Sequence, residues 1–265
     1  MSFQPILPVG GYAGWRFLER TMERQQEAFD KSATVQRDID YFAEKIGKVT
    51  NADEIVSDYR LLKVALGAFG LQDDIGSKFF IRKILSEGTS AKDALANKLA
   101  DKSYFKLAEA FGFGGSGPPR TQEPGFVDRI AKAYRERSFE MAIGEQNNDM
   151  RLALNIDREL GGIAGGEQSD RAKWFSVLGS GPMRQVFDKA FGLPTAFAAI
   201  DLDRQVEVYR EKAKAMFGSS EAAQFTDPDK RDKLIKMFLI RSEIAAGFGG
   251  TSPGQTALTL LRGGG

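Results

Sequence analysis

The chain has 265 residues, which is enough for one large domain or two small ones. Its 37 basic residues balance 36 acidic ones, so charge gives no reason to expect nucleic acid or an anionic membrane as a partner. It contains no histidine and no cysteine, which excludes disulfides, thiol nucleophiles, Ser-His-Asp catalysis and ordinary zinc sites.

Residues 1–14 form an N-terminal arm rich in glycine and aromatic residues. The arm lacks the basic region and the apolar core of a signal peptide, so a cytoplasmic location is expected. Two roles stay open for the end of the arm and the residues that follow it. The segment docks on the core, or it orders on a partner protein with Tyr12, Trp15 and Phe17 as anchors.

From residue 15 onwards, apolar residues recur at helical spacing, and no segment shows the sustained alternation of a strand. The sequence therefore predicts an all-α fold: a multi-helix bundle of two intimately packed helical lobes built from short, glycine-capped helices. The first lobe is expected at residues 15–113 and the second at residues 126–265. The Gly/Pro-rich residues 114–125 are expected to connect them.

The sequence Ala-Phe-Gly occurs at residues 68–70, 110–112 and 190–192, each time after an apolar stripe. Glycine adopts a left-handed backbone without a Cβ clash, so Gly70, Gly112 and Gly192 are predicted to end helices. The first of these helices should begin at Asn51, which forms a capping box with Glu54. One helical face should carry Ile55, Tyr59, Leu62, Leu66 and Phe69. As an alternative, the three corners also line a shared groove for a partner.

Other helix boundaries follow from the same signals. Ser90 with Asp93 is expected to cap a short helix, and Gly161 is expected to end a longer one. Asp227 before Pro228 marks a helix start. A last short helix is expected within residues 252–261.

The apolar run at residues 79–85 has a wide apolar face, so its helix is expected to be buried on several sides. Arg82 lies within this run, and Arg241 lies within a second apolar run near the C-terminus. Each arginine needs a carboxylate or carbonyl partner. Each is therefore either part of a structural ion pair or an anchor that faces a partner protein.

No motif indicates a cofactor. The glycine-rich residues 112–117 follow a helix and lack the Gly-Lys-Ser/Thr ending of a phosphate-binding loop. Pairs of acidic residues one or two positions apart occur at several places, but most stand at predicted helix starts, where caps and the helix dipole favour acids. We therefore predict no catalytic, cofactor-binding or metal-binding residues, no nucleic-acid partner and no membrane span.

Five segments carry a resemblance to a known family. They are residues 10–18, 61–71, 78–83, 144–146 together with 150–155, and 190–194. Together they resemble an alphaproteobacterial family of unknown function that is encoded among flagellar genes and is sometimes labelled flagellar basal-body rod protein. The resemblance implies partners among flagellar components and carries over no catalytic residue. Axial flagellar proteins have long heptad helices at both termini and β-rich middle domains, which this sequence lacks.

The leading hypothesis is a non-enzymatic, helical protein-binding accessory protein in bacterial flagellar assembly or function. Its location would be the cytoplasm or the flagellum. The alternative is an enzyme that uses carboxylates to act on a small molecule. A concave pocket in which acids converge with a basic residue would favour that alternative.

Overall fold

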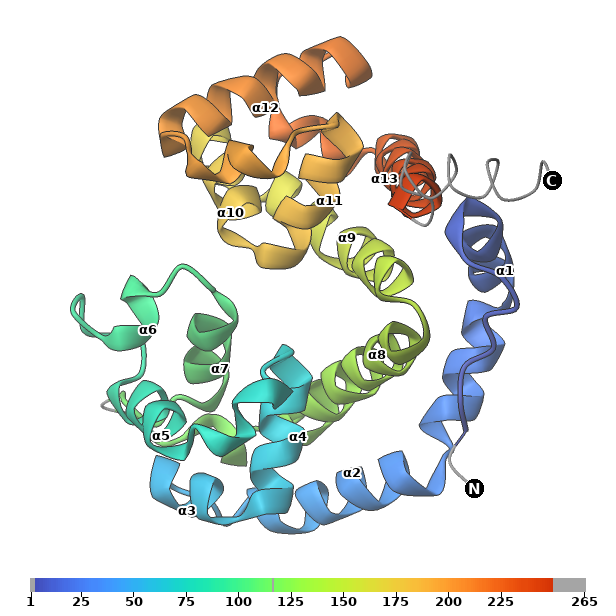
Figure 1. Cartoon of the computed structure of the whole chain (residues 1–265). Helices are drawn as coiled ribbons and strands as arrows, with labels where there is room; N and C mark the ends of the chain where they lie inside the picture. Colours follow the sequence, from blue (N-terminus) through green and yellow to red (C-terminus); the bar gives the residue numbers. More distant parts are fainter. Residues whose placement is uncertain (1–2, 116, 250–265) are drawn as a thin grey trace, which may run out of the picture. The chain divides into compact units, whose positions relative to one another are not determined.

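The computed structural model describes residues 3–115 and 117–249 (Figure 1). Within these ranges the chain forms thirteen α-helices, four short 3-10 helices and no strand, so the all-α prediction is confirmed. The short helix predicted within residues 252–261 lies outside the described residues.

The α-helices have the following bounds: α1 Gly11–Asp30, α2 Ala33–Ile46, α3 Ala52–Ser57, α4 Tyr59–Phe69, α5 Lys78–Glu87, α6 Leu95–Lys98, α7 Ser103–Phe111, α8 Phe126–Gln146, α9 Asn148–Gly165, α10 Asp170–Gly179, α11 Gly181–Phe191, α12 Leu202–Phe217 and α13 Pro228–Gly249. The 3-10 helices are η1 Gln72–Gly76, η2 Arg120–Gln122, η3 Thr195–Ala199 and η4 Ala222–Thr226.

The chain forms two compact units. Unit 1 comprises Met1–Leu7 and Leu18–Gln146, and unit 2 comprises Pro8–Phe17 and Asn147–Gly265. The segment 114–125, predicted to connect two lobes, lies within unit 1. The reason is that α8 belongs to the core of unit 1: the Phe126 ring at its start lies 5.3 Å from the Phe111 ring and 6.5 Å from the Phe42 ring.

Helix α4 forms the centre of unit 1 and lies beside α8 (Figure 1). Seven of its eleven residues are buried, including Leu62 and Leu66, which are fully enclosed. The two helices approach closely at Gly67, where an added Cβ would lie 2.8 Å from the Tyr134 ring. Glycine is therefore required at residue 67 for close helix packing and not for its backbone freedom.

The helix predicted from Asn51 to Phe69 is broken in two at Asp58. Asp58 has an extended backbone, and its side chain caps α4 by accepting bonds from the Arg60 and Leu61 N–H groups. Its other oxygen accepts the Tyr41 hydroxyl at 2.7 Å. Burial raises the pKa of Asp58, but the bonds from Tyr41, Leu61 and Arg60 outweigh burial and lower this pKa below its ordinary value.

The break also corrects the predicted apolar face, because Tyr59 is 58% exposed at the start of α4. The start of α3 follows the predicted pattern. The Asn51 side chain accepts the Glu54 N–H at 3.0 Å, and the Glu54 carboxylate accepts the Thr50 N–H at 2.7 Å. The sequence therefore indicated the first cap and missed the second one seven residues later.

The three Ala-Phe-Gly segments all end helices, and their glycines have left-handed backbones with φ of 74°, 67° and 67° at Gly70, Gly112 and Gly192. At Gly70 the bond from Leu71 N to Leu66 O completes a Schellman motif. The equivalent bond at Gly192 joins Leu193 N to Asp188 O. Gly112 makes the simpler left-handed cap, with its N–H donating to Ala108 O.

Three other sequence expectations are wrong. Gly161 lies inside α9, because Leu160 and Ala164 are both buried and continue its apolar face. Ala94, and neither Ser90 nor Asp93, occupies the N-cap of α6.

The third concerns α5, which is not buried on several sides. Its buried face consists of Ile81, Ile84 and Leu85, while Phe79 is 71% exposed.

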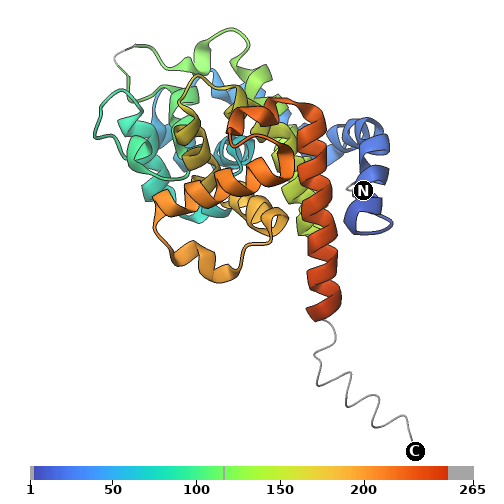
Figure 2. The same ribbon diagram turned by 90° about the horizontal axis from the view of Figure 1, so that it is seen from above.

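Unit 2 has an aromatic core centred on Trp174. Its ring makes edge-to-face contacts with Phe187, Tyr209 and Phe225, with ring centroids 5.7–6.3 Å apart. Helix α13 runs as one uninterrupted helix in Figure 2. Its start matches the predicted signal, since the Asp227 side chain accepts the Asp229 N–H at 3.0 Å.

No helix in the described ranges is both long enough and apolar enough to cross a membrane.

Candidate functional site

The aromatic residues predicted as anchors all lie in unit 2. Trp15 is only 2% exposed, so its side chain belongs to the core of the unit. Tyr12 is half-buried, and the Lys236 ammonium lies 5.2 Å from its ring centroid. Phe17 is also half-buried. Helix α1 already begins at Gly11, inside the stretch predicted as an arm.

The first residues of the arm pack within unit 1. The Gln25 side chain accepts the Ile6 N–H at 2.6 Å and donates to Ile6 O at 3.2 Å. Gln146 donates to Pro5 O at 2.7 Å. These bonds hold residues 5 and 6 against α1 and α8 of unit 1.

Arg241 has a carbonyl partner. Its Nη1 donates to Ala190 O at 2.6 Å, in the last turn of α11 and beside Gly192. A cation at this place also interacts favourably with the negative end of the helix dipole. The geometry therefore gives Arg241 a stabilising role at the end of α11.

Arg82, in contrast to the half-buried Arg241, is exposed at the surface of unit 1. It is an exposed residue of α5, and its Nη1 lies 3.2 Å from Asp53 Oδ1 on α3. Its guanidinium lies 5.2 Å from the centroid of the Phe79 ring. The ion pair and the cation–π contact together hold the arginine side chain beside an exposed aromatic ring.

These residues line a shallow pocket of 330 Å³ between α3 and α5, which we call the Phe79 surface. It consists of Asp53, Val56, Ser57, Lys78, Phe79 and Arg82. Val56 is 7% exposed and supplies an apolar base, whereas Phe79 is the most exposed large apolar side chain in the described part of the chain. The surface can accept an apolar side chain and present Lys78 to a carboxylate.

The helical geometry of α5 explains why Phe79 is exposed. Successive residues turn by about 100°, so a residue two places before Ile81 lies on the opposite side of the helix. Ile81, Ile84 and Leu85 face the core, and Phe79 therefore faces away from it. A helical wheel of α5 would have placed Phe79 outside the face formed by Ile81, Ile84 and Leu85. Treating residues 79–81 as one apolar run hid the exposure of Phe79.

Buried tyrosines do not supply a general base. Four of the six tyrosines donate their hydroxyl to an aspartate, at 2.6–2.8 Å. Burial, followed by the bond to the aspartate, raises the pKa of Tyr104 and Tyr134 far above neutral pH. Burial and the negative charge of Asp188 also raise the pKa of Tyr209. Each of these phenols therefore stays protonated at neutral pH.

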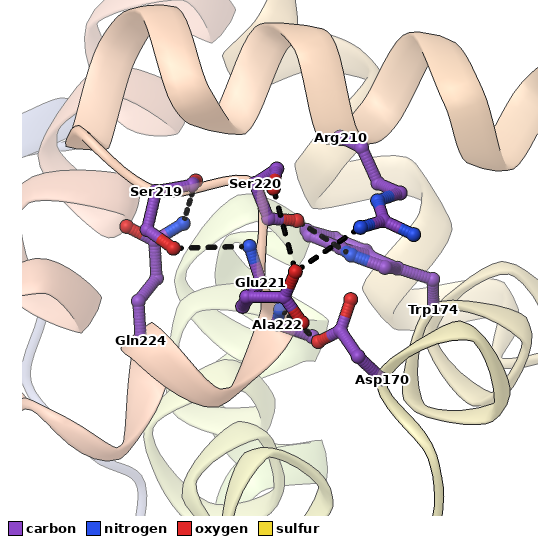
Figure 3. A network of polar contacts seen from close by, with 8 residues as sticks. All are labelled: Asp170, Trp174, Arg210, Ser219, Ser220, Glu221, Ala222 and Gln224. Carbon is purple, nitrogen blue, oxygen red and sulfur yellow. Dashed lines mark hydrogen bonds and ion pairs between the residues drawn. The ribbon is translucent and has the colours of Figure 1, made fainter.

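A polar network in unit 2 holds the loop between α12 and η4 (Figure 3). Trp174 Nε1 donates to Ser220 O at 3.0 Å, and Asp170 Oδ1 accepts the Ala222 N–H at 2.6 Å. Arg210 pairs with Glu221 at 3.1 Å. Because these bonds mostly reach backbone groups of one loop, the network fixes the conformation of that loop over the aromatic core.

Acidic side chains do not gather into a metal site within the described residues: no three of them are close enough together to hold an ion.

Comparison with known proteins gives a family and a fold. The family described as "Protein of unknown function (DUF1217)" matches residues 68–230. The chain is similar to a protein from Agrobacterium tumefaciens whose crystal structure was determined by a structural genomics consortium. The two share 31% sequence identity and a TM-score of 0.73, over 91% of this chain and 99% of that chain. No curated protein matches the chain.

Proposed function

We propose that this chain, which belongs to the DUF1217 family of proteins of unknown function, is a non-enzymatic protein-binding accessory protein. The proposal is based on the chemistry of its surface. The observation that carries the proposal is the 71% exposure of Phe79 beside Arg82. A large exposed aromatic side chain next to an arginine is typical of residues that dominate protein–protein binding.

The Phe79 surface favours one kind of partner. Its pocket is large enough for a single apolar side chain, and Lys78 and Arg82 line it. Arg82 already has a carboxylate partner in Asp53, so a second carboxylate would bind most readily near Lys78. We therefore expect a partner protein that presents an apolar side chain followed or preceded by an acidic residue.

The proposed setting is flagellar assembly or function, in the cytoplasm or at the flagellum. This part of the proposal rests on the resemblance of residues 10–18, 61–71 and 78–83 to a family encoded among flagellar genes. Residues 78–83 include Phe79 and Arg82. The segment that carries part of the resemblance thus also carries the exposed aromatic surface.

A motility assay tests this proposal. Deleting the gene should impair swimming and leave growth intact, and wild-type protein should restore swimming. Phe79→Ala should fold normally and fail to restore it, because the substitution removes an exposed ring and little core packing. Tyr59→Ala is the matched control, since Tyr59 is also an exposed aromatic residue of unit 1 and does not line the pocket. Normal swimming of the deletion strain would contradict the proposal.

The enzymatic alternative is less well supported by the geometry of these sites. It needs two carboxylates, or a carboxylate and a free base, that converge on a small molecule. Asp38, which lies beside both a tyrosine and a lysine, is only 9% exposed and accepts bonds from Tyr134 and Lys63. An enzymatic assay against a panel of small molecules would have to detect turnover to favour this alternative.

A further inference from the structure

Unit 1 contains a second and larger hollow, separate from the Phe79 surface. It has a volume of 630 Å³, within the range of pockets that hold small organic ligands. Its wall is formed by the end of α1, the start of α2, α4, η1, α8 and the first described residues of the chain. The side chains that line this wall determine which ligand the cavity can bind.

Two cations line the cavity, and the carboxylates paired with them do not. Lys63 and Arg137 line the cavity, and their carboxylate partners Asp38 and Glu140 do not. Lys63 Nζ lies 2.6 Å from Asp38, and Arg137 Nη1 lies 3.6 Å from Glu140. The one acid that lines the cavity is Glu145, an exposed residue. The wall therefore exposes two cations and several hydroxyl groups, and the carboxylates paired with these cations do not line it.

The start of α2 also favours an anion. Ser32, Thr34 and Val35 line the cavity, so the first turn of this 14-residue helix borders it. Ser32 occupies the N-cap and its side chain makes no capping bond. The N–H groups of a first helical turn and the positive end of the helix dipole both favour an anion.

One side-chain amide in the wall has no strong partner. Gln72 Nε2 donates only to the sulfur of Met141, at 3.1 Å, and its buried Oε1 has no partner. Sulfur is a weak acceptor, so either orientation of the amide leaves one end without a good bond. Gln72 is half-buried, and its amide can bind a polar group of a ligand.

The remaining wall is apolar, with Phe29, Val35 and Met141 among its members. We propose that this cavity binds a small organic anion with an apolar body. The anionic head lies at Lys63, Arg137 and the start of α2, and the apolar body lies against Phe29 and Met141. This binding site is independent of the proposed protein-binding surface, which lies between α3 and α5.

Three probes that share a phenylalkyl body and differ in the charge of the head group test the proposal on the full-length chain. They are phenylbutyrate, which is an anion, its neutral amide, and phenylbutylamine, which is a cation. In isothermal titration calorimetry at low salt, we expect phenylbutyrate to bind with a Kd on the order of 0.1–1 mM, the strength typical of a ligand of this size. We expect its affinity to exceed that of the amide and the amine by roughly tenfold or more, because only the anion uses the cations of the wall.

Two variants locate the binding. Lys63→Gln should weaken phenylbutyrate about five- to tenfold and leave the neutral amide unchanged, because it removes a cation of the wall. Lys132→Gln is the matched control: it removes the same charge from an exposed place on α8 outside the cavity and should leave both affinities unchanged. Ala142→Phe should abolish binding by filling the cavity.

Several results would overturn the proposal. They are no binding of phenylbutyrate to the wild-type chain, equal affinity for the amine or the amide, equal weakening by the two lysine variants, or undiminished binding to a folded Ala142→Phe. The comparison of the three probes needs no variant, so a destabilised Lys63→Gln would still leave the proposal open to refutation.

Discussion

The contact between Arg241 and the end of α11 yields a quantitative prediction at Gly192. A Cβ built on Gly192 would lie 2.8 Å from Arg241 Nη1, whereas a Cβ built on Gly218 would meet no atom within 4 Å. Both glycines are left-handed C-caps in unit 2, with φ of 67° and 90°. Gly218→Ala is therefore a control that carries the backbone strain without the clash.

The backbone strain of an alanine in a left-handed conformation is about 1–2 kcal/mol in each variant. In Gly192→Ala the guanidinium, as the flexible end of a side chain, moves away and loses its bond to Ala190 O. A hydrogen bond from a charged group contributes about 1.5–3 kcal/mol, and a half-buried arginine recovers part of this from water. We therefore expect Gly192→Ala to destabilise the unit by about 1–2 kcal/mol more than Gly218→Ala.

Urea unfolding followed by tryptophan fluorescence measures this difference, because Trp15 and Trp174, the two tryptophans of the chain, both belong to unit 2. The excess cost should vanish when both glycine variants are made in an Arg241→Met background, which has no bond to lose. Equal costs for the two glycine variants in the wild-type background would refute the reasoning. An excess that persists without the arginine would refute it as well.

Three further predictions concern stability. Asp58→Ala should lower the free energy of unfolding by about 1–2 kcal/mol at pH 7, since it removes the cap of α4. Because the pKa of Asp58 is lowered in the folded state, its contribution is complete above the ordinary pKa and is lost as the pH falls through the folded-state value. Urea melts followed by circular dichroism should therefore show a constant gap to wild type from pH 7 down to about pH 5 and a narrowing gap at lower pH. Trp174→Phe removes the bond to Ser220 O and should cost about 1–3 kcal/mol in thermal unfolding, and an unchanged Tm would count against the loop network. Thr121→Val should cost about 1–2 kcal/mol in the same assay, because it leaves Val49 O without its donor, and a stabilised variant would contradict this.

Local signals in the sequence predicted the helices and their glycine ends well. The left-handed caps at Gly70, Gly112 and Gly192 depend on a few adjacent residues, and a glycine after an apolar stripe is enough to predict them. The break at Asp58 depends on a contact with Tyr41, seventeen residues earlier, which no local pattern reveals. The same is true of the unbroken course of α9 through Gly161, which follows from burial of its neighbours.

The candidate surfaces could be predicted only in part. Arg82 was recognised from an arginine within an apolar run, but the exposure of Phe79 depends on which face of α5 meets the core. The cavity in unit 1 could not be predicted, because its wall combines residues from the first described part of the chain with residues as distant as Gln146. Such a hollow is a property of packing, and composition and spacing contain no signal for it.

The central proposal is that this chain acts by binding a protein through the Phe79 surface, and complementation of swimming tests it most directly. A deletion strain would receive the wild-type gene, Phe79→Ala or Tyr59→Ala, with equal protein levels and equal Tm verified for all three. The account predicts that wild type and Tyr59→Ala restore swimming and that Phe79→Ala does not. Full swimming with Phe79→Ala, or normal swimming of the deletion strain itself, would contradict it.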